Sequence, residues 1–140
     1  MIGPDFELQE AVVAALKASV DLQSLLGNPI RLYENVPSKP VFPYVTIGES
    51  QAIPDEAECI DGTEVIMTLH IWSRSAAGFG EAKKISATMW SVLSSAGIET
   101  LSENRVVIFD RAPLGDLSIR DPDGVTKHIV SQYRGLCEPL

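Results

Sequence analysis

The chain has 140 residues, of which 45% are hydrophobic and 21% are charged, and it carries a net charge of −8 with a pI near 4.6. This is the composition of one ordinary globular domain, which needs neither a metal nor a disulfide to fold and which argues against wholesale disorder. The excess of carboxylates repels phosphate backbones and therefore argues against nucleic-acid binding as the main function.

Cysteine content and hydropathy indicate a chain that is made and kept in a reducing cytoplasm. Cys59 and Cys137 are the two cysteines, too few for a disulfide scaffold, and we expect both thiols to be free. No secretory signal precedes the first helical pattern. The longest apolar run is far shorter than the roughly 20 residues that a membrane span requires.

The N-terminal third predicts two helices and a short strand. Phe6 to Ser19 has an amphipathic pattern, with Asp5 as the expected N-cap. A shorter helix is expected to begin at Asp21 and to end at Gly27-Asn28-Pro29, because proline cannot continue it. A short strand is then expected over Ile30–Tyr33.

A proline-rich connector (34–43) leads to a second expected strand, Tyr44–Glu49. The stretch after it, Gln51–Gly62, is acidic and poor in bulky apolar residues, which predicts a solvated loop. Its carboxylates lack the spacing of a calcium-binding loop. A loop of this length in a compact domain is often functional, so it is a natural place for a partner to dock.

The centre of the chain predicts one strand followed by one helix. In Glu64–Ser73, apolar side chains alternate, so that Val65, Met67, Leu69 and Ile71 share one face. In Phe79–Ser95 the apolar residues recur at three- and four-residue steps and form one stripe. We expect these two surfaces to pack against each other as the core.

The C-terminal part predicts a hairpin. Leu101–Arg111 alternates as a strand, Ala112–Gly115 reads as a bulge or kink, and an extended pattern resumes at Asp116. The tetrapeptide Asp121-Pro122-Asp123-Gly124 is a strong turn signal, and a long strand is expected over Val125–Glu138.

This order of elements predicts a single domain over residues 1–140 of the α+β class. With one helix between strands, a doubly wound parallel sheet is disfavoured. We expect a mainly antiparallel sheet of four or five strands, with the two longer helices packed on one face.

No catalytic, cofactor-binding or metal-binding residue is predicted. Gly78-Phe79-Gly80 lacks the lysine of a phosphate-binding loop, and no Gly-x-Ser-x-Gly motif occurs. His70 and His128 are each mid-strand and have no cysteine or histidine at metal-ligand spacing. We interpret His70 as a hydrogen-bonded structural histidine.

Four groups of short stretches occur in a characteristic order along nearly the whole chain. They are Leu8–Leu16 with Asp21–Gly27, Val36-Pro37 with Pro43–Gly48, Leu69–Arg74 with Gly78 and the helix after it, and Arg120–Gly124. In their order and spacing these stretches resemble the tail completion, or tail terminator, proteins of tailed bacteriophages and gene transfer agents.

The resemblance implies a structural virion protein without catalytic residues. Such a protein forms a ring, typically a hexamer, on the head-proximal end of the tail tube, where it stops tube polymerisation and joins the tail to the head–neck connector. The implied partners are copies of the chain itself, the tail tube protein and the connector or stopper protein, with no membrane. DNA passes through the lumen without specific binding, and assembly takes place in the bacterial host cytoplasm.

We expect the ring contacts to be made by edge strands and by two loops, Gln51–Gly62 and Ala112–Asp116. The residues expected in these interaction loops are Pro54, Asp55, Glu56, Glu58, Asp61, Pro113, Leu114 and Asp116. Three alternatives stay open: another neck component, such as a stopper or connector; a small-molecule binding module unrelated to virions; and an enzyme whose site is assembled between subunits.

Overall fold

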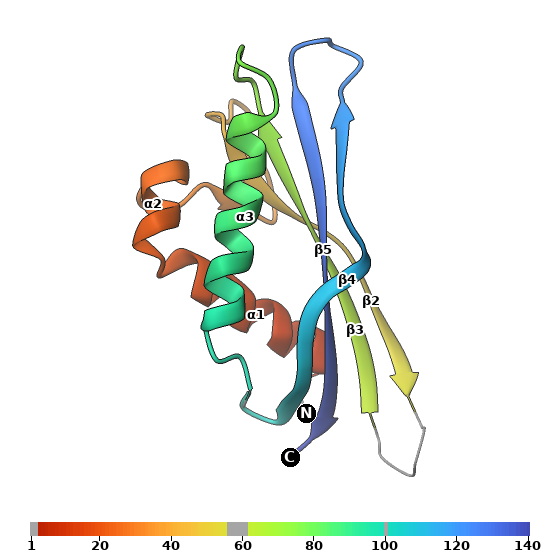
Figure 1. Ribbon diagram of the computed structural model, residues 1–140. Coiled ribbons are helices and arrows are strands. Elements are labelled where there is room, and N and C mark those ends of the chain that lie inside the picture. The colour runs from red at the N-terminus through yellow and green to blue at the C-terminus, as the bar shows by residue number, and fades with distance from the viewer. Residues whose placement is uncertain (1–2, 56–61, 100) are drawn as a thin grey trace.

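The computed structural model describes residues 3–55, 62–99 and 101–140 and has two layers, a five-stranded sheet and three helices that cover the same face of it (Figure 1). The predicted α+β class is confirmed. The helices are α1 (Pro4–Lys17), α2 (Val20–Leu26) and α3 (Gly80–Ser95), and the strands are β1 (Leu32–Tyr33), β2 (Tyr44–Asp55), β3 (Gly62–Ser73), β4 (Asn104–Arg120) and β5 (Lys127–Pro139).

The strands lie in the order β1-β2-β3-β5-β4, so β3 and β5 are central. The pairs β2–β3, β3–β5 and β4–β5 are antiparallel, whereas β1 pairs in parallel with β2. The sheet is therefore mixed. The β2–β3 hairpin extends toward one end of the molecule and the β4–β5 turn toward the other (Figure 1).

The hydrophobic core lies between the helices and one face of β3 and β5. The predicted inward residues of β3, Val65, Met67, Leu69 and Ile71, are at most 2% exposed. Leu8 of α1 lies so close to β5 that a Cβ built on Gly135 would be 2.7 Å from its Cδ2. The expected packing of strand against helix is confirmed. The facing residues of the helices and β5 are Leu8, Val12, Leu16, Ala82, Ile85, Met89, Leu93, Ile129, Tyr133 and Cys137.

Two helix starts differ from the sequence predictions. Asp5 was the expected N-cap of α1, and this is wrong: Pro4 occupies the first turn and Gly3 the cap position, without a side-chain hydrogen bond. Proline suits the first turn because its missing N–H has no helical partner there. In α2 the hydroxyl of Ser19 caps the helix by accepting a hydrogen bond of 3.2 Å from the Leu22 amide.

Glu7 joins α1 to the start of β4 through a buried carboxylate. It accepts hydrogen bonds from the Ser102 amide at 2.7 Å, the Glu103 amide at 3.0 Å and the Asn104 side chain at 2.6 Å. Burial by itself raises the pKa of Glu7, but these hydrogen bonds outweigh it and the net pKa is lowered. Glu7 is therefore a buried anion held by its donors.

The predicted loop Gln51–Gly62 is wrong at both ends. Gln51–Asp55 continues β2 and pairs with Gly62–Ile66 of β3. Gln51, Ala52 and Pro54 are exposed, so this segment lacks the alternation of apolar residues that predicts a half-buried strand. Residues 56–61 lie outside the described residues.

The second predicted loop, Ala112–Asp116, is part of β4. The ladder with β5 shifts register between Arg111 and Asp116, so the bulge predicted over Ala112–Gly115 is confirmed and the loop is wrong. A second, smaller irregularity lies between Val106 and Ile108.

One-sided burial of β3 predicts unequal costs for two substitutions in the same strand. Leu69→Ala should lower the free energy of unfolding by about 2–5 kcal/mol, because it leaves a cavity under the helices. The matched control Ile66→Ala removes a half-buried side chain from the other face and should cost well under half as much. Urea unfolding of both variants measures the difference, and equal losses would contradict a sheet covered on one side.

Candidate functional site

The predicted interaction residues lie at opposite edges of the sheet. Pro54 and Asp55 end β2, whereas Pro113, Leu114 and Asp116 belong to the β4 bulge, and β3 and β5 lie between the two groups. Glu56, Glu58 and Asp61 lie outside the described residues. The structure does not bring these two groups together within one copy of the chain.

Asp116 is engaged within the domain. Its carboxylate accepts a hydrogen bond from the Ser86 hydroxyl of α3, and Ser86 also lies 3.3 Å from the Ser131 hydroxyl of β5. Asp116 therefore fastens the bulged part of β4 to the helix layer. This internal contact does not support its expected role as a docking residue.

Both edges of the sheet present unpaired strand. β1 covers β2 only at Val45 and Thr46, so within the described residues the outer side of Ile47–Asp55 has no strand partner. Pro54 fits such an edge, because proline has no N–H to contribute to a ladder. At the other edge, the outer side of β4 has no strand partner among the described residues. Free edges of this kind can pair with another chain.

The face of the sheet opposite the helices carries an aromatic cluster. The rings of Trp72 and His128 stack with centroids 3.9 Å apart and an interplanar angle of 11°. Tyr44 stacks on Trp72 at 6.4 Å, and the Trp72 indole N–H donates to the Thr46 hydroxyl at 3.1 Å. The cluster links the neighbouring ends of β2, β3 and β5 on the face opposite the helices.

The two histidines of this face form a pair. His70 Nδ1 lies 2.7 Å from His128 Nε2, and His70 Nε2 lies 3.4 Å from a Glu49 carboxylate oxygen. A Cβ at Gly48 would overlap the His70 ring, so glycine is required beneath it. His70 is thus a hydrogen-bonded histidine, as predicted. Burial, and then the proximity of His70, lower the pKa of His128.

The described residues offer no evident metal site. In residues 3–55, 62–99 and 101–140, no three His, Cys, Asp or Glu side chains come together as possible ligands. The buried thiol of Cys137 has a pKa raised to about 11, first by burial and then by Glu7, so it is a poor nucleophile at neutral pH.

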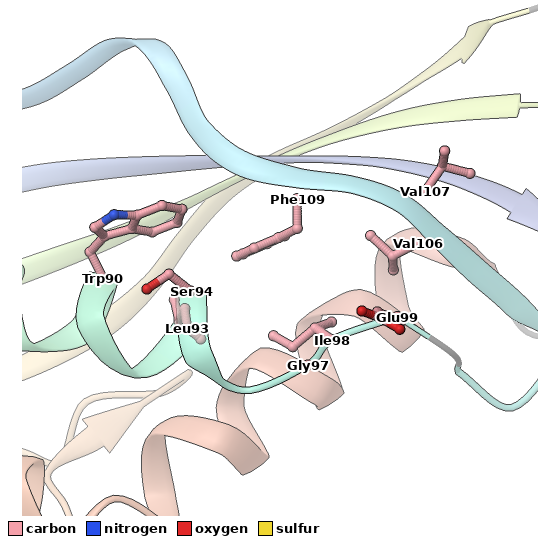
Figure 2. Close-up of a pocket in the computed structure, with 9 residues that line it drawn as sticks. All are labelled: Trp90, Leu93, Ser94, Gly97, Ile98, Glu99, Val106, Val107 and Phe109. Carbon is pink, nitrogen blue, oxygen red and sulfur yellow. The ribbon is translucent and has the colours of Figure 1, made fainter.

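A pocket lies between the C-terminal end of α3 and the outer edge of β4 (Figure 2). Its volume is about 250 Å³, and Val106 and Phe109 point from β4 toward the helix end, whereas Val107 points away. Trp90 stacks with Phe109 at 6.2 Å. The lining is mixed, because Ser94 and Glu99 stand beside the apolar side chains. Its lining residues are Trp90, Leu93, Ser94, Gly97, Ile98, Glu99, Val106, Val107 and Phe109.

A five-stranded sheet with three helices on one face, and with strand edges that have no partner among the described residues, defines the class of the protein: a small α+β domain. The family model of tail completion protein gp17 matches residues 10–138. The chain belongs to this family, which confirms the resemblance seen in the sequence. It is a tail completion protein, and the family is one of structural tail proteins.

Two solved structures share the fold. A chain of the virion of a native gene transfer agent particle is 24% identical with a TM-score of 0.78, over 95% of this chain and 96% of that chain. The bacteriophage SPP1 gp17 protein is 24% identical with a TM-score of 0.58, over 94% of this chain and 88% of its own. No curated protein matches the sequence. Within the described residues, no helix has the length and apolarity to cross a membrane.

Sequence reasoning missed the His70–His128 pair and the free edge of β2. The two histidines are 58 residues apart and meet only because β3 pairs with β5. Pro54 was the one local signal for an edge strand, and the surrounding polar residues obscured it.

The histidine pair makes stability depend on pH. Because the folded pKa of His128 is below its unfolded value of about 6.5, the unfolded chain binds a proton first, and the free energy of unfolding should fall as pH drops below about 6.5. The carboxyl groups of Glu7 and Asp123, whose pKa values are lowered, change the free energy of unfolding only at more acidic pH. Urea titrations at pH 7.5, 6.5 and 5.5 measure this dependence. Between pH 7.5 and 5.5 the free energy of unfolding should fall less for His128→Gln than for the wild type. An equal fall in both proteins would show that His128 is not the group responsible.

Proposed function

We propose that this chain forms a hexameric ring on the head-proximal end of the tail tube, where it ends tube polymerisation and joins the tail to the head–neck connector. Family membership supports a role in tail completion. The partners in this proposal are other copies of the chain, the tail tube protein and the connector or stopper protein, with final localisation in the tail or neck of the virion.

The single observation that favours a ring is the presence of two different free edges on opposite sides of one rigid sheet. A ring requires a heterologous contact, in which one surface of a subunit meets a different surface of the next. A domain with only one adhesive surface would stop at a dimer. β2 and β4 provide two such surfaces, and they are held apart by β3 and β5.

The acidic balance of the chain supports a lumen through which DNA passes without binding. The net charge is −8, and the carboxylates Asp55, Glu56, Glu58 and Asp61 are concentrated within seven positions of the sequence. If these side chains face the lumen, they repel the DNA backbone during its passage. Pro54 precedes them on β2, and Pro113 and Leu114 are the corresponding proposed contacts on β4.

Removing the gene tests the terminator role. Particles made without this chain should show tails of uncontrolled length that are not joined to heads, because nothing stops the addition of tube subunits. Electron microscopy of negatively stained particles measures both properties. Tails of normal length that fail only to join heads would indicate a stopper or connector instead, and normal virions would refute a structural role.

Neutralising the acidic stretch tests the lumen. The variant Asp55→Asn/Glu56→Gln/Glu58→Gln/Asp61→Asn should assemble but eject its genome more slowly, because cationic or neutral walls interact more favourably with phosphates. A matched control replaces Asp5, Glu10, Asp21 and Glu34 in the same way, because these carboxylates lie outside the acidic stretch of the sequence. Ejection kinetics equal to those of the wild type would remove this part of the proposal.

A further inference from the structure

We propose that the free edge of β2 in one copy pairs with the free edge of β4 in the next copy, as an antiparallel ladder between Ser50–Ile53 and Ile108–Arg111. This inference rests on the proposed ring and specifies the contact that closes it. The occupant of each edge is therefore a second copy of this chain, rather than a strand of another tail protein.

The strand directions permit this pairing. β2 and β5 run in one direction, while β3 and β4 run in the opposite one, because each neighbouring pair among them is antiparallel. Rotation about a ring axis that runs along the strands preserves their directions. β4 of one copy therefore meets β2 of the next in an antiparallel arrangement, which is compatible with a continuous ladder.

The two segments also lie at the same level across the sheet. Ser50 pairs with Met67, Met67 with Tyr133 and Tyr133 with Arg111, and in the same way Ile53 leads through Glu64 and Leu136 to Ile108. Each segment is a regular run. Ser50–Ile53 follows the irregularity of β2, and Ile108–Arg111 lies between the two irregularities of β4. An unstaggered rotation brings one run opposite the other.

Side chains then match across the new pair. On the open face, Ile53 faces Ile108, whose side chain is 49% exposed in the single chain, and Gln51 faces Asp110. Cross-strand apolar and hydrogen-bonding pairs of this kind stabilise a sheet. Burying the two isoleucines removes apolar surface that the isolated domain leaves in water.

On the helix side, the pocket at the β4 edge accommodates the incoming strand. Ser50, Ala52 and Pro54 point to the helix side of β2, are exposed, and are all small. Neighbouring strands are about 4.8 Å apart, so these residues would enter beside Phe109 and Val106, below the end of α3 (Figure 2). Ala52 would lie opposite Phe109 in the proposed register, where its small side chain demands little room.

Charge favours the same assignment. From Pro40 to Ser73 the sequence has no lysine or arginine, and Glu49, next to Ser50, has a 79% exposed side chain. β4 carries Arg105, Arg111 and Arg120. Pairing of two β2 edges would bring like charges together, whereas pairing with β4 places a segment without lysine or arginine beside a strand that carries three arginines.

Cysteine cross-linking tests the pairing in assembled particles. In a Cys59→Ser background, the double variant Gln51→Cys/Asp110→Cys should give a ladder of cross-linked chains with a short bis-maleimide, which also bridges a slip of two residues, roughly 7 Å. Neither single variant should cross-link, because each lacks one half of the heterologous contact. The matched control Gln51→Cys/Leu117→Cys places its second thiol on the same strand beyond the bulge, and it should give no ladder.

Each contrary result has a defined meaning. Dimers from either single variant would show pairing of like edges, a ladder from the control would show a different register, and a link to another tail protein would show a different occupant. Each of these overturns the inference, as does the absence of a ladder in particles that contain the ring. Particles that lack this chain altogether would instead overturn the proposed function.

Discussion

The structure depends on the burial of one face of two central strands beneath two amphipathic helices. The inward side chains of β3 and β5 are nearly inaccessible to water, and α1 and α3 supply the apolar stripes that cover them. Hydrophobic burial of this extent is the main favourable contribution to folding. The close approach of Leu8 to Gly135 and the buried hydrogen bonds of Glu7 fix the position of α1 on the sheet.

Because all three helices cover the same face, the other face and both edges of the sheet remain available (Figure 1). The aromatic cluster around Trp72 and the pair of His70 with His128 link neighbouring strands on that face. A stiff sheet holds its two edges in a constant relative orientation. This property is required of a subunit that repeats around an axis, since a small angular error accumulates over a ring.

The irregularities in β2 and β4 also limit which strands can pair with the free edges of the sheet. A bulge interrupts the hydrogen-bonding pattern of an edge strand and so reduces indiscriminate pairing with other chains. In β4 the irregularities divide the strand, so that the short regular run Ile108–Arg111 lies beside the pocket, while in β2 the regular run follows Gly48, where the His70 ring leaves no room for a side chain. Restricting regular edge to short segments favours one partner and one register over many.

The sequence by itself determined the α+β class, the inward residues of β3 and α3, the C-terminal hairpin with its bulge, and the family. These features depend on local periodicity, turn residues and the order of short motifs along the chain. Tertiary structure alone decided that Gln51–Asp55 is an edge strand, that Asp116 binds Ser86, and that His70 meets His128. The physical reason is that strand pairing and contacts between distant side chains join residues far apart in the chain, and no local pattern specifies which of them become neighbours.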